Sequence, residues 1–120
     1  MPPDASPDQE QDPKQPSYDA LNALLATSTA AALNPQNAPA AQALAAQTRQ
    51  ATSGQLDELD RGVFIANTGE LRAAKTAMTP CMKDLKNLKA QIAKLGADVK
   101  EGAAIISGID AALSELIKLL

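Results

Sequence analysis

The chain has 120 residues, and its 11 Lys and Arg against 14 Asp and Glu give a formal net charge of −3. This length allows one domain, and the negative charge argues against nucleic acid as a partner, because contacts to phosphates require an excess of Lys and Arg. The composition is alanine-rich, with one Tyr, one Phe and no Trp, which favours long, thinly packed helices over a sheet.

Residues 1–16 contain five prolines and four acidic residues and show no apolar periodicity. Such a segment cannot offset its ordering entropy by burial, so we expect an acidic, disordered, proline-rich tail. It serves either as a solubilising tail or as a segment that a partner or an export machine engages. Because neither a secretory signal peptide nor a long apolar run is recognisable, we expect a cytoplasmic protein, or one exported by a route without a cleaved signal.

Two helical segments are predicted after the tail. Ser17 suits the N-cap of a first helix over 17–33, and Pro35 ends it because the residue before a proline avoids the helical conformation. The spacing of apolar residues predicts a second helix over 40–78. Its register slips by one residue near 67–69, which indicates a break there.

A third helix is predicted to begin at Thr79 and Pro80, since threonine can cap a helix and proline suits its first position. From Met78 to the last residue, apolar side chains occupy the a and d positions of a heptad without a slip. This pattern predicts one uninterrupted helix over 80–120 that packs lengthwise against other helices.

The fold class that follows is all-α. We expect a short extra N-terminal helix and a long helical hairpin or coiled coil, together forming a single helical domain over 17–120. A reversal at 79–80 gives an antiparallel hairpin with arms of nearly equal length. A reversal at 67–69 is the alternative, and it leaves the last helix longer than its partner.

The final helix has more apolar surface than the rest of the chain can cover. After Gly102 the charged residues become sparse, whereas the preceding helices offer few large apolar side chains. Uncovered apolar patches mark interaction sites, so we expect this end to contact a partner protein or further copies of the chain. The predicted partner-binding residues are Leu95, Val99, Ile105, Ile106, Ile109, Leu113, Leu116, Ile117 and Leu120.

Two further regularities lie on the outer face of this helix. Alanine recurs every seven residues opposite the apolar stripe, which reflects either helix propensity alone or a second face that another helix touches. A basic strip also runs along it, but aromatic residues do not accompany it and acidic residues interrupt it, so nucleic-acid binding is not expected. The alanines are Ala90, Ala97, Ala104 and Ala111, and the strip is Lys83, Lys86, Lys89 and Lys94.

The sequence offers little for catalysis. Histidine is absent, which leaves no imidazole base and disfavours a zinc cluster. Cys81 occupies a d position and is expected to be a small core residue, with a reactive thiol near a helix N-terminus as the alternative. The carboxylates of Asp57, Glu58 and Asp60 are expected on a solvated helix face. We therefore predict no catalytic, cofactor-binding or metal-binding residues, and no enzymatic activity.

These observations favour a non-enzymatic helical interaction protein, a small structural subunit or adaptor that assembles with itself or with a partner. In shape and composition the chain is similar to small, aromatic-poor helical parts of bacterial secretion or phage machines, although no motif matches a particular family. One alternative is a helical chaperone or adaptor that sheathes an apolar segment of a client or exported protein. Another is an amphipathic protein on a membrane surface, for which residues 102–120 offer Lys118 to anionic lipid.

Overall fold

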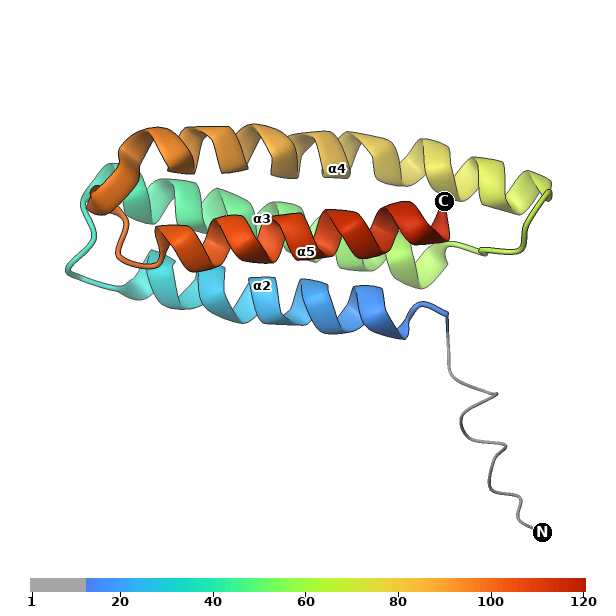
Figure 1. The fold of residues 1–120 in the computed structure, drawn as a ribbon, viewed down its shortest axis with the longest axis horizontal. Coiled ribbons are helices and arrows are strands. Elements are labelled where there is room, and N and C mark those ends of the chain that lie inside the picture. The colour runs from blue at the N-terminus through green and yellow to red at the C-terminus, as the bar shows by residue number, and fades with distance from the viewer. Residues whose placement is uncertain (1–12) are drawn as a thin grey trace, which may run out of the picture.

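The computed structural model describes residues 13–120, and this part of the chain is all-α, as predicted (Figure 1). The predicted disorder of the tail lies largely outside the described residues. The described part consists of α2 (Gln15–Leu33), α3 (Pro39–Arg61), α4 (Gly69–Leu95), the short 3₁₀ helix η1 (Gly96–Asp98) and α5 (Gly102–Leu119).

The four α-helices form an antiparallel bundle in which each helix packs against its neighbours in the chain, and α5 closes the ring against α2. Figure 1 shows α4 along the top, α2 along the bottom, and α3 and α5 between them. The α2–α3 pair is the most closely packed and the α4–α5 pair is the least. This asymmetry leaves the α4–α5 side of the bundle more open than the others.

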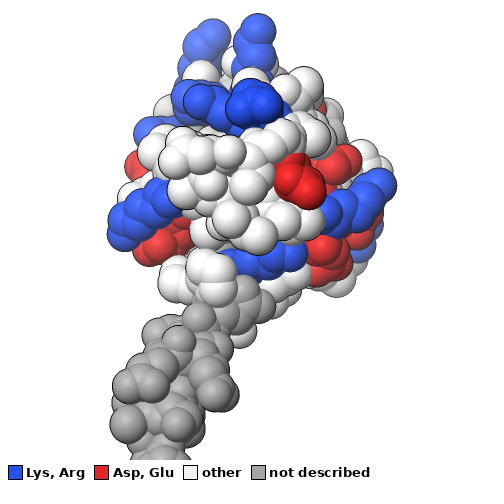
Figure 2. Space-filling view, turned by 90° about the vertical axis from the view of Figure 1, so that its right-hand side faces the viewer, with Lys and Arg blue, Asp and Glu red and all other residues white. Residues whose placement is uncertain are grey.

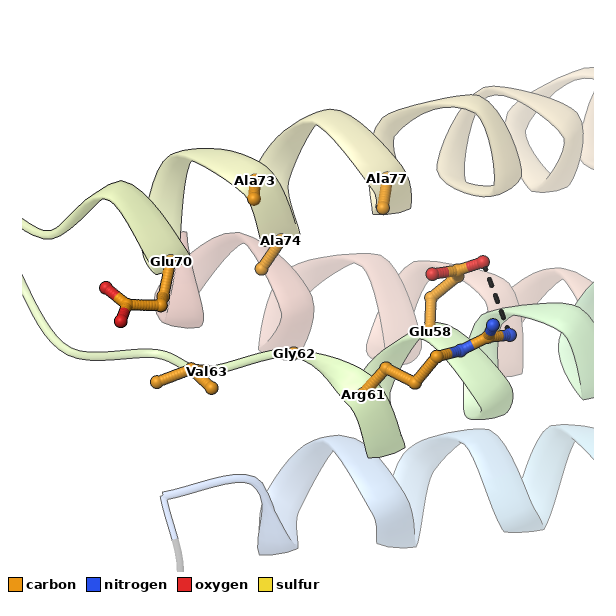
Figure 3. A pocket seen from close by; sticks show the side chains of 8 residues that line it. All are labelled: Glu58, Arg61, Gly62, Val63, Glu70, Ala73, Ala74 and Ala77. Atoms are coloured by element: carbon orange, nitrogen blue, oxygen red, sulfur yellow. Dashed lines mark ion pairs between the residues drawn. The ribbon is translucent and has the colours of Figure 1, made fainter.

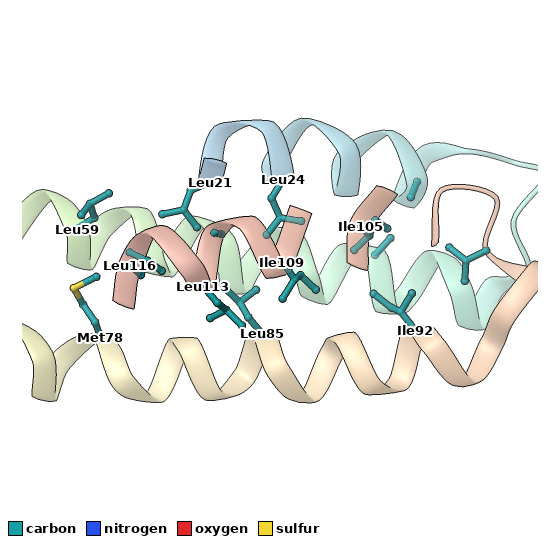
Figure 4. Close-up of a cluster of buried hydrophobic side chains, with 14 of the residues drawn as sticks. Leu21, Leu24, Leu59, Met78, Leu85, Ile92, Ile105, Ile109, Leu113 and Leu116 are labelled. Carbon is teal, nitrogen blue, oxygen red and sulfur yellow. The ribbon is translucent and has the colours of Figure 1, made fainter. Parts of the chain in front are cut away.

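One hydrophobic core runs through the bundle and draws on all four helices (Figure 4). Its centre is aliphatic, and burying each such side chain is worth roughly 1.5–3 kcal/mol. Helix α5 contributes a full stripe to this core, so it is an integral part of the bundle. The largest fully buried apolar side chains are Leu21, Leu24, Leu59, Met78, Leu85, Ile92, Ile105, Ile109 and Leu116.

Small side chains explain why α2 lies so close to its neighbours. Facing α3, the buried positions are mostly Ala, Ser and Thr, and the hydroxyls of Ser28 and Thr52 donate to backbone carbonyls one turn earlier at 2.8 and 2.7 Å. Facing α5, Gly108 lies against Leu24, and a Cβ on this glycine would be 3.1 Å from Leu24 Cδ1. An alanine at position 108 would therefore require the end of the Leu24 side chain to shift slightly.

Helix α2 begins at Gln15, so the predicted boundary of the tail at residue 16 was wrong by two residues. Pro16 is accommodated because the first turn of a helix does not need its N–H groups for intrahelical bonds. Ser17 consequently lies inside the helix, where it is buried, and it does not act as the predicted N-cap.

The predicted helix over 40–78 and the reversal at 79–80 were wrong. Helix α3 ends at Arg61, the chain reverses over residues 62–68, and α4 continues through Pro80. The alternative prediction, a reversal at 67–69, is closer to the observed turn over residues 62–68. Thr68 supplies the N-cap of α4, since its Oγ1 accepts a hydrogen bond of 3.1 Å from the Leu71 amide.

Pro80 is tolerated in the middle of α4 because tertiary packing holds the helix on both sides of it. Met78 and Leu85 are fully buried in the core, whereas Pro80 itself is exposed. Without an N–H, Pro80 leaves the carbonyl of Thr76 without its usual helical donor, and the local helix geometry is weakened.

Replacing Pro80 with alanine is expected to raise the free energy of unfolding by about 2 kcal/mol. A mid-helix proline costs about 3 kcal/mol relative to alanine, and part of this gain is lost because alanine frees the unfolded chain. Urea unfolding followed by circular dichroism measures the change. Lys83→Ala, at another exposed position of α4, serves as the control with an expected change below about 0.5 kcal/mol. An unchanged or lower stability of Pro80→Ala would contradict a continuous α4.

The predicted single helix over 80–120 was also wrong, because the chain turns back between α4 and α5. Gly96 adopts φ +57° and ψ −125°, a backbone conformation that residues with a Cβ rarely occupy. Val99 and Gly102, which the heptad pattern placed inside a helix, are both buried within or at the end of this turn. The apolar pattern therefore continues through the turn while the chain reverses direction.

Hydrogen bonds join the α4–α5 turn to the α2–α3 turn at the same end of the bundle. The Glu101 carboxylate accepts from Asn34 Nδ2 at 2.9 Å and from Asn37 Nδ2 at 2.8 Å. Buried Asn37 also donates to the Ala31 carbonyl at 3.0 Å and accepts from the Lys100 amide at 2.8 Å. These bonds, which we call the Glu101 clasp, fix the two turns relative to each other.

Candidate functional site

Most of the predicted partner-binding side chains pack against the chain's own helices. Ile105, Ile109 and Leu116 are fully buried, and Val99 and Leu113 are at most 7% exposed. A partner cannot reach Val99, Ile105, Ile109 or Leu116 in the folded bundle, whereas Leu113 keeps a small exposed part that lines the groove between α4 and α5. Of the other four, Leu95, Ile106 and Leu120 are half-buried, and Ile117 is 59% exposed.

An open groove lies between α4 and α5, where the two helices are least closely packed, and Ile117 lines it. Its volume is about 750 Å³. Alanines on α4 form one side of its apolar floor, and Leu113 and Ile117 on α5 form the other. The α4–α5 groove is lined by Lys86, Lys89, Ala90, Ala93, Asp110, Leu113, Ser114, Ile117 and Lys118.

Lysines stand on both sides of the groove. On α4, Lys89 donates to Asp110 across the groove at 2.6 Å, while Lys86 has no ion pair among the described residues. On α5, Lys118 pairs with Glu115 at 3.5 Å, and its side chain remains 68% exposed. The rim is therefore positively charged around an apolar floor.

A second hollow of about 510 Å³ extends the groove along α4 toward the C-terminus of the chain. It shares Lys86 with the α4–α5 groove and has Leu120 at its edge. At 1.5 Å per residue, the stretch of α4 that lines both hollows is about 27 Å long. The residues of the second hollow are Lys75, Thr79, Met82, Lys83, Lys86, Asn87 and Leu120.

Helix α4 concentrates the positive charge of the molecule. It contains six Lys and Arg and two acidic residues, in a chain whose net charge is −3. Figure 2 shows Lys and Arg gathered at the top of the molecule, where α4 lies, and acidic side chains mainly lower down. An anionic group approaching this face therefore meets a favourable local field.

A smaller hollow lies between the end of α3 and the beginning of α4 (Figure 3). Its volume is about 250 Å³, and alanines of α4 form much of its wall. The Arg61 guanidinium lies 3.6 Å from the Glu58 carboxylate, so the two charges largely offset each other. The small volume of this hollow makes it a weaker candidate than the α4–α5 groove.

The groups that could carry chemistry are not arranged for it. Partial burial, followed by the carboxylates of Glu58 and Asp84, raises the pKa of the Cys81 thiol above its ordinary value of 9.0. A raised pKa lowers the thiolate fraction at neutral pH, which disfavours the alternative of a reactive cysteine. Cys81 is half-buried beside Gly54. Within residues 13–120, no three His, Cys, Asp or Glu side chains gather into a potential metal site.

Two buried polar side chains lack hydrogen-bond partners among the described protein atoms. They are Ser17 of α2 and Gln55 of α3, each at most 1% exposed. Both are closed off from the surface, and neither lines the α4–α5 groove. Their unpaired atoms cost stability, and they supply no accessible binding group.

Comparison of the chain with protein-family models, curated proteins and solved structures finds no match. Among the helices of the described part, none is long and apolar enough to cross a membrane. The geometry of the α4–α5 groove is therefore the basis on which a function is assigned.

The sequence indicated part of this site. Of the nine predicted residues, Leu113 and Ile117 line the α4–α5 groove and Leu120 lines the hollow beside it. The alanine repeat pointed to Ala90, and the basic strip pointed to Lys83, Lys86 and Lys89. What the sequence could not show is that the turn at residues 96–101 brings these α4 side chains beside those of α5.

Proposed function

We propose that the chain is a non-catalytic interaction protein that binds a helix of a partner protein in the α4–α5 groove, as a small structural subunit or adaptor does. The observation that supports this function is an open groove with an apolar floor on a bundle whose own core is complete. Among the residues that line the groove, Ile117 is a large apolar side chain that is exposed, so a partner that covers it removes apolar surface from water.

The floor of the groove suits a helix. Ala90 and Ala93 lie one turn apart on α4, and their short side chains allow another backbone to approach closely. Leu113 and Ile117 lie one turn apart on α5 and offer the larger apolar contacts. Rows of small and large residues at this spacing are typical of grooves that accept one face of an amphipathic helix.

A second copy of the chain is a poorer occupant. In a symmetric dimer formed through this face, the same patch would meet itself, which brings Lys86 and Lys83 of one copy toward those of the other. Like charges at an interface oppose association. We therefore favour a different protein over self-assembly, and sedimentation equilibrium at several concentrations should report a monomer.

The same groove would also serve a chaperone that holds a client helix. A membrane surface fits less well, because a bilayer contacts convex apolar surfaces and this floor is recessed between two helices. The occupant that the geometry favours remains a helix of another protein.

The test uses the full chain and an 18-residue helical peptide with a Leu/Ala face and Gln on its other positions. Fluorescence anisotropy should show binding, and the amide resonances of Ala90, Ala93 and Ser114 should shift most in the ¹⁵N spectrum. Ala93→Gln fills the floor and should weaken binding by about tenfold or more, because close helix packing is lost.

Leu33→Gln is the matched control, because Leu33 is 76% exposed on α2 and lies outside the α4–α5 groove. It should leave the peptide affinity unchanged. Spectral shifts that map to α2 and α3, or equal effects of the two substitutions, would refute binding in this groove.

A further inference from the structure

We propose that the α4–α5 groove selects a helix that carries acidic residues on both flanks of its apolar face. This inference rests on the proposed function and adds the chemistry of the partner. Three observations support it: lysines stand on both walls of the groove, several of them form no ion pair within the described residues, and an acidic side chain lies among them.

The lysines stand on both walls of one apolar channel. Lys86 and Lys89 rise from α4 on one side of the floor, and Lys118 rises from α5 on the other. A helix lying in the channel with its apolar face inward would present one flank to the two lysines of α4 and the other flank to Lys118 of α5. Glu or Asp at those flanking positions would meet a lysine on either side, as opposite charges do beside a coiled-coil interface.

Several of these ammonium groups form no ion pair in the described part of the chain. Within residues 13–120, Lys75, Lys83 and Lys86 form no ion pair, although all three line the second hollow along α4, and Lys86 lines the α4–α5 groove as well. Lys89 and Lys118 each have one acidic partner, the exposed Asp110 and the half-buried Glu115. A ligand carboxylate would therefore find three unpaired ammonium groups and could share the other two.

The same features count against other anionic ligands. Asp110 lies among the lysines of the groove, and the residues that line the groove and the second hollow include no aromatic side chain on which a base could stack. A flat anionic membrane could reach the lysine tips but would not fill the groove down to Leu113, which is 7% exposed. An acidic amphipathic helix satisfies the floor and the rim together.

The test compares three 18-residue peptides with the same Leu/Ala face and with Glu, Gln or Lys at the flanking positions. Anisotropy titrations with the full chain in low salt should give about tenfold tighter binding for the Glu peptide than for the Gln peptide, and weaker binding still for the Lys peptide. Raising the salt concentration to about 0.5 M should remove most of this preference, because exposed charge pairs are screened.

A charge-reversed chain sharpens the test. Lys83→Glu combined with Lys86→Glu should shift the preference from the Glu peptide toward the Lys peptide. Arg49→Glu, an exposed change on α3 outside the groove, is the matched control and should preserve the preference for Glu. Equal affinities for all three peptides would overturn the inference, while binding of the Gln peptide would still uphold the proposed function.

Three other results would also overturn it. Tighter binding of a 20-bp DNA duplex, or of anionic phosphatidylglycerol vesicles, than of the Glu peptide would assign the basic face to those ligands. Binding of the Glu peptide only after removal of residues 1–12 would assign the groove to the chain's own acidic segment.

Discussion

Replacing Ile109 with alanine should lower the free energy of unfolding by about 2–5 kcal/mol, whereas Ile117→Ala should lower it by less than about 1 kcal/mol. Both isoleucines lie on α5, but Ile109 is fully buried and Ile117 is 59% exposed. Truncating a buried isoleucine loses its transfer free energy and leaves a cavity between α5 and its neighbours. Truncating an exposed side chain loses little transfer free energy and leaves no enclosed cavity.

This pair of variants tests whether α5 is part of the core or a free docking helix, since a docking helix would make the two losses similar and small. Unfolding in guanidinium chloride, with a common m-value for the two variants, gives the difference between their free energies of unfolding. For peptide affinity the order of the two effects should reverse. Ile117→Ala should weaken binding more than Ile109→Ala does, because Ile117 lines the groove and Ile109 does not. Equal stability losses would refute the four-helix packing described above.

The helical class and much of the core could be read from the sequence because both depend on apolar periodicity. Met78, Leu85 and Ile92 recur every seven residues along the heptad pattern and are fully buried. After the turn Ile109 and Leu116 keep to the pattern and are fully buried, whereas Ile105 is fully buried in place of Ile106, which is half-buried. Periodicity therefore located the buried stripe in each helix, but it did not reveal that the two stripes belong to antiparallel helices.

The turn itself was hidden by a coincidence of spacing. Val99 and Gly102 fall on heptad positions and are buried, because a turn at the end of a bundle also points apolar groups inward. The local signal that could have revealed it was Gly96, at the place where α4 ends and the backbone takes a positive φ. A heptad pattern alone cannot distinguish one long helix from two helices joined by a short turn.

Pro80 shows the opposite error, in which a strong local signal was overruled by packing. Thr79 and Pro80 satisfy the usual rules for a helix start, yet core contacts on either side keep α4 continuous. Residues 62–68 form the true reversal with weaker signals. Local propensities are worth at most a few kcal/mol, and burial of several large side chains exceeds that.

Glu101→Gln is expected to destabilise the bundle by about 1–3 kcal/mol at neutral pH, which is the usual worth of hydrogen bonds to a charged group. The Glu101 carboxylate accepts from the side chains of Asn37 and Asn34 and connects two turns that are distant in sequence. Glutamine would place an NH₂ group opposite one of these donors. Glu115→Gln, which removes an exposed ion pair, should cost less than about 0.5 kcal/mol and is the control.

The pH dependence of this loss identifies its cause. Hydrogen bonds from Asn37 and then Asn34 lower the pKa of Glu101 below its ordinary value of 4.5 in the folded chain, against a smaller opposing effect of burial. A group with a lowered folded pKa stabilises the fold above its unfolded pKa, and this contribution is lost as the pH falls through the folded pKa. The difference between wild type and Glu101→Gln should thus be largest at about pH 6–7 and shrink as the pH falls below about 4.5. A difference that stays constant down to about pH 2.5 would mean that the shape of the side chain, and not its charge, holds the two turns together.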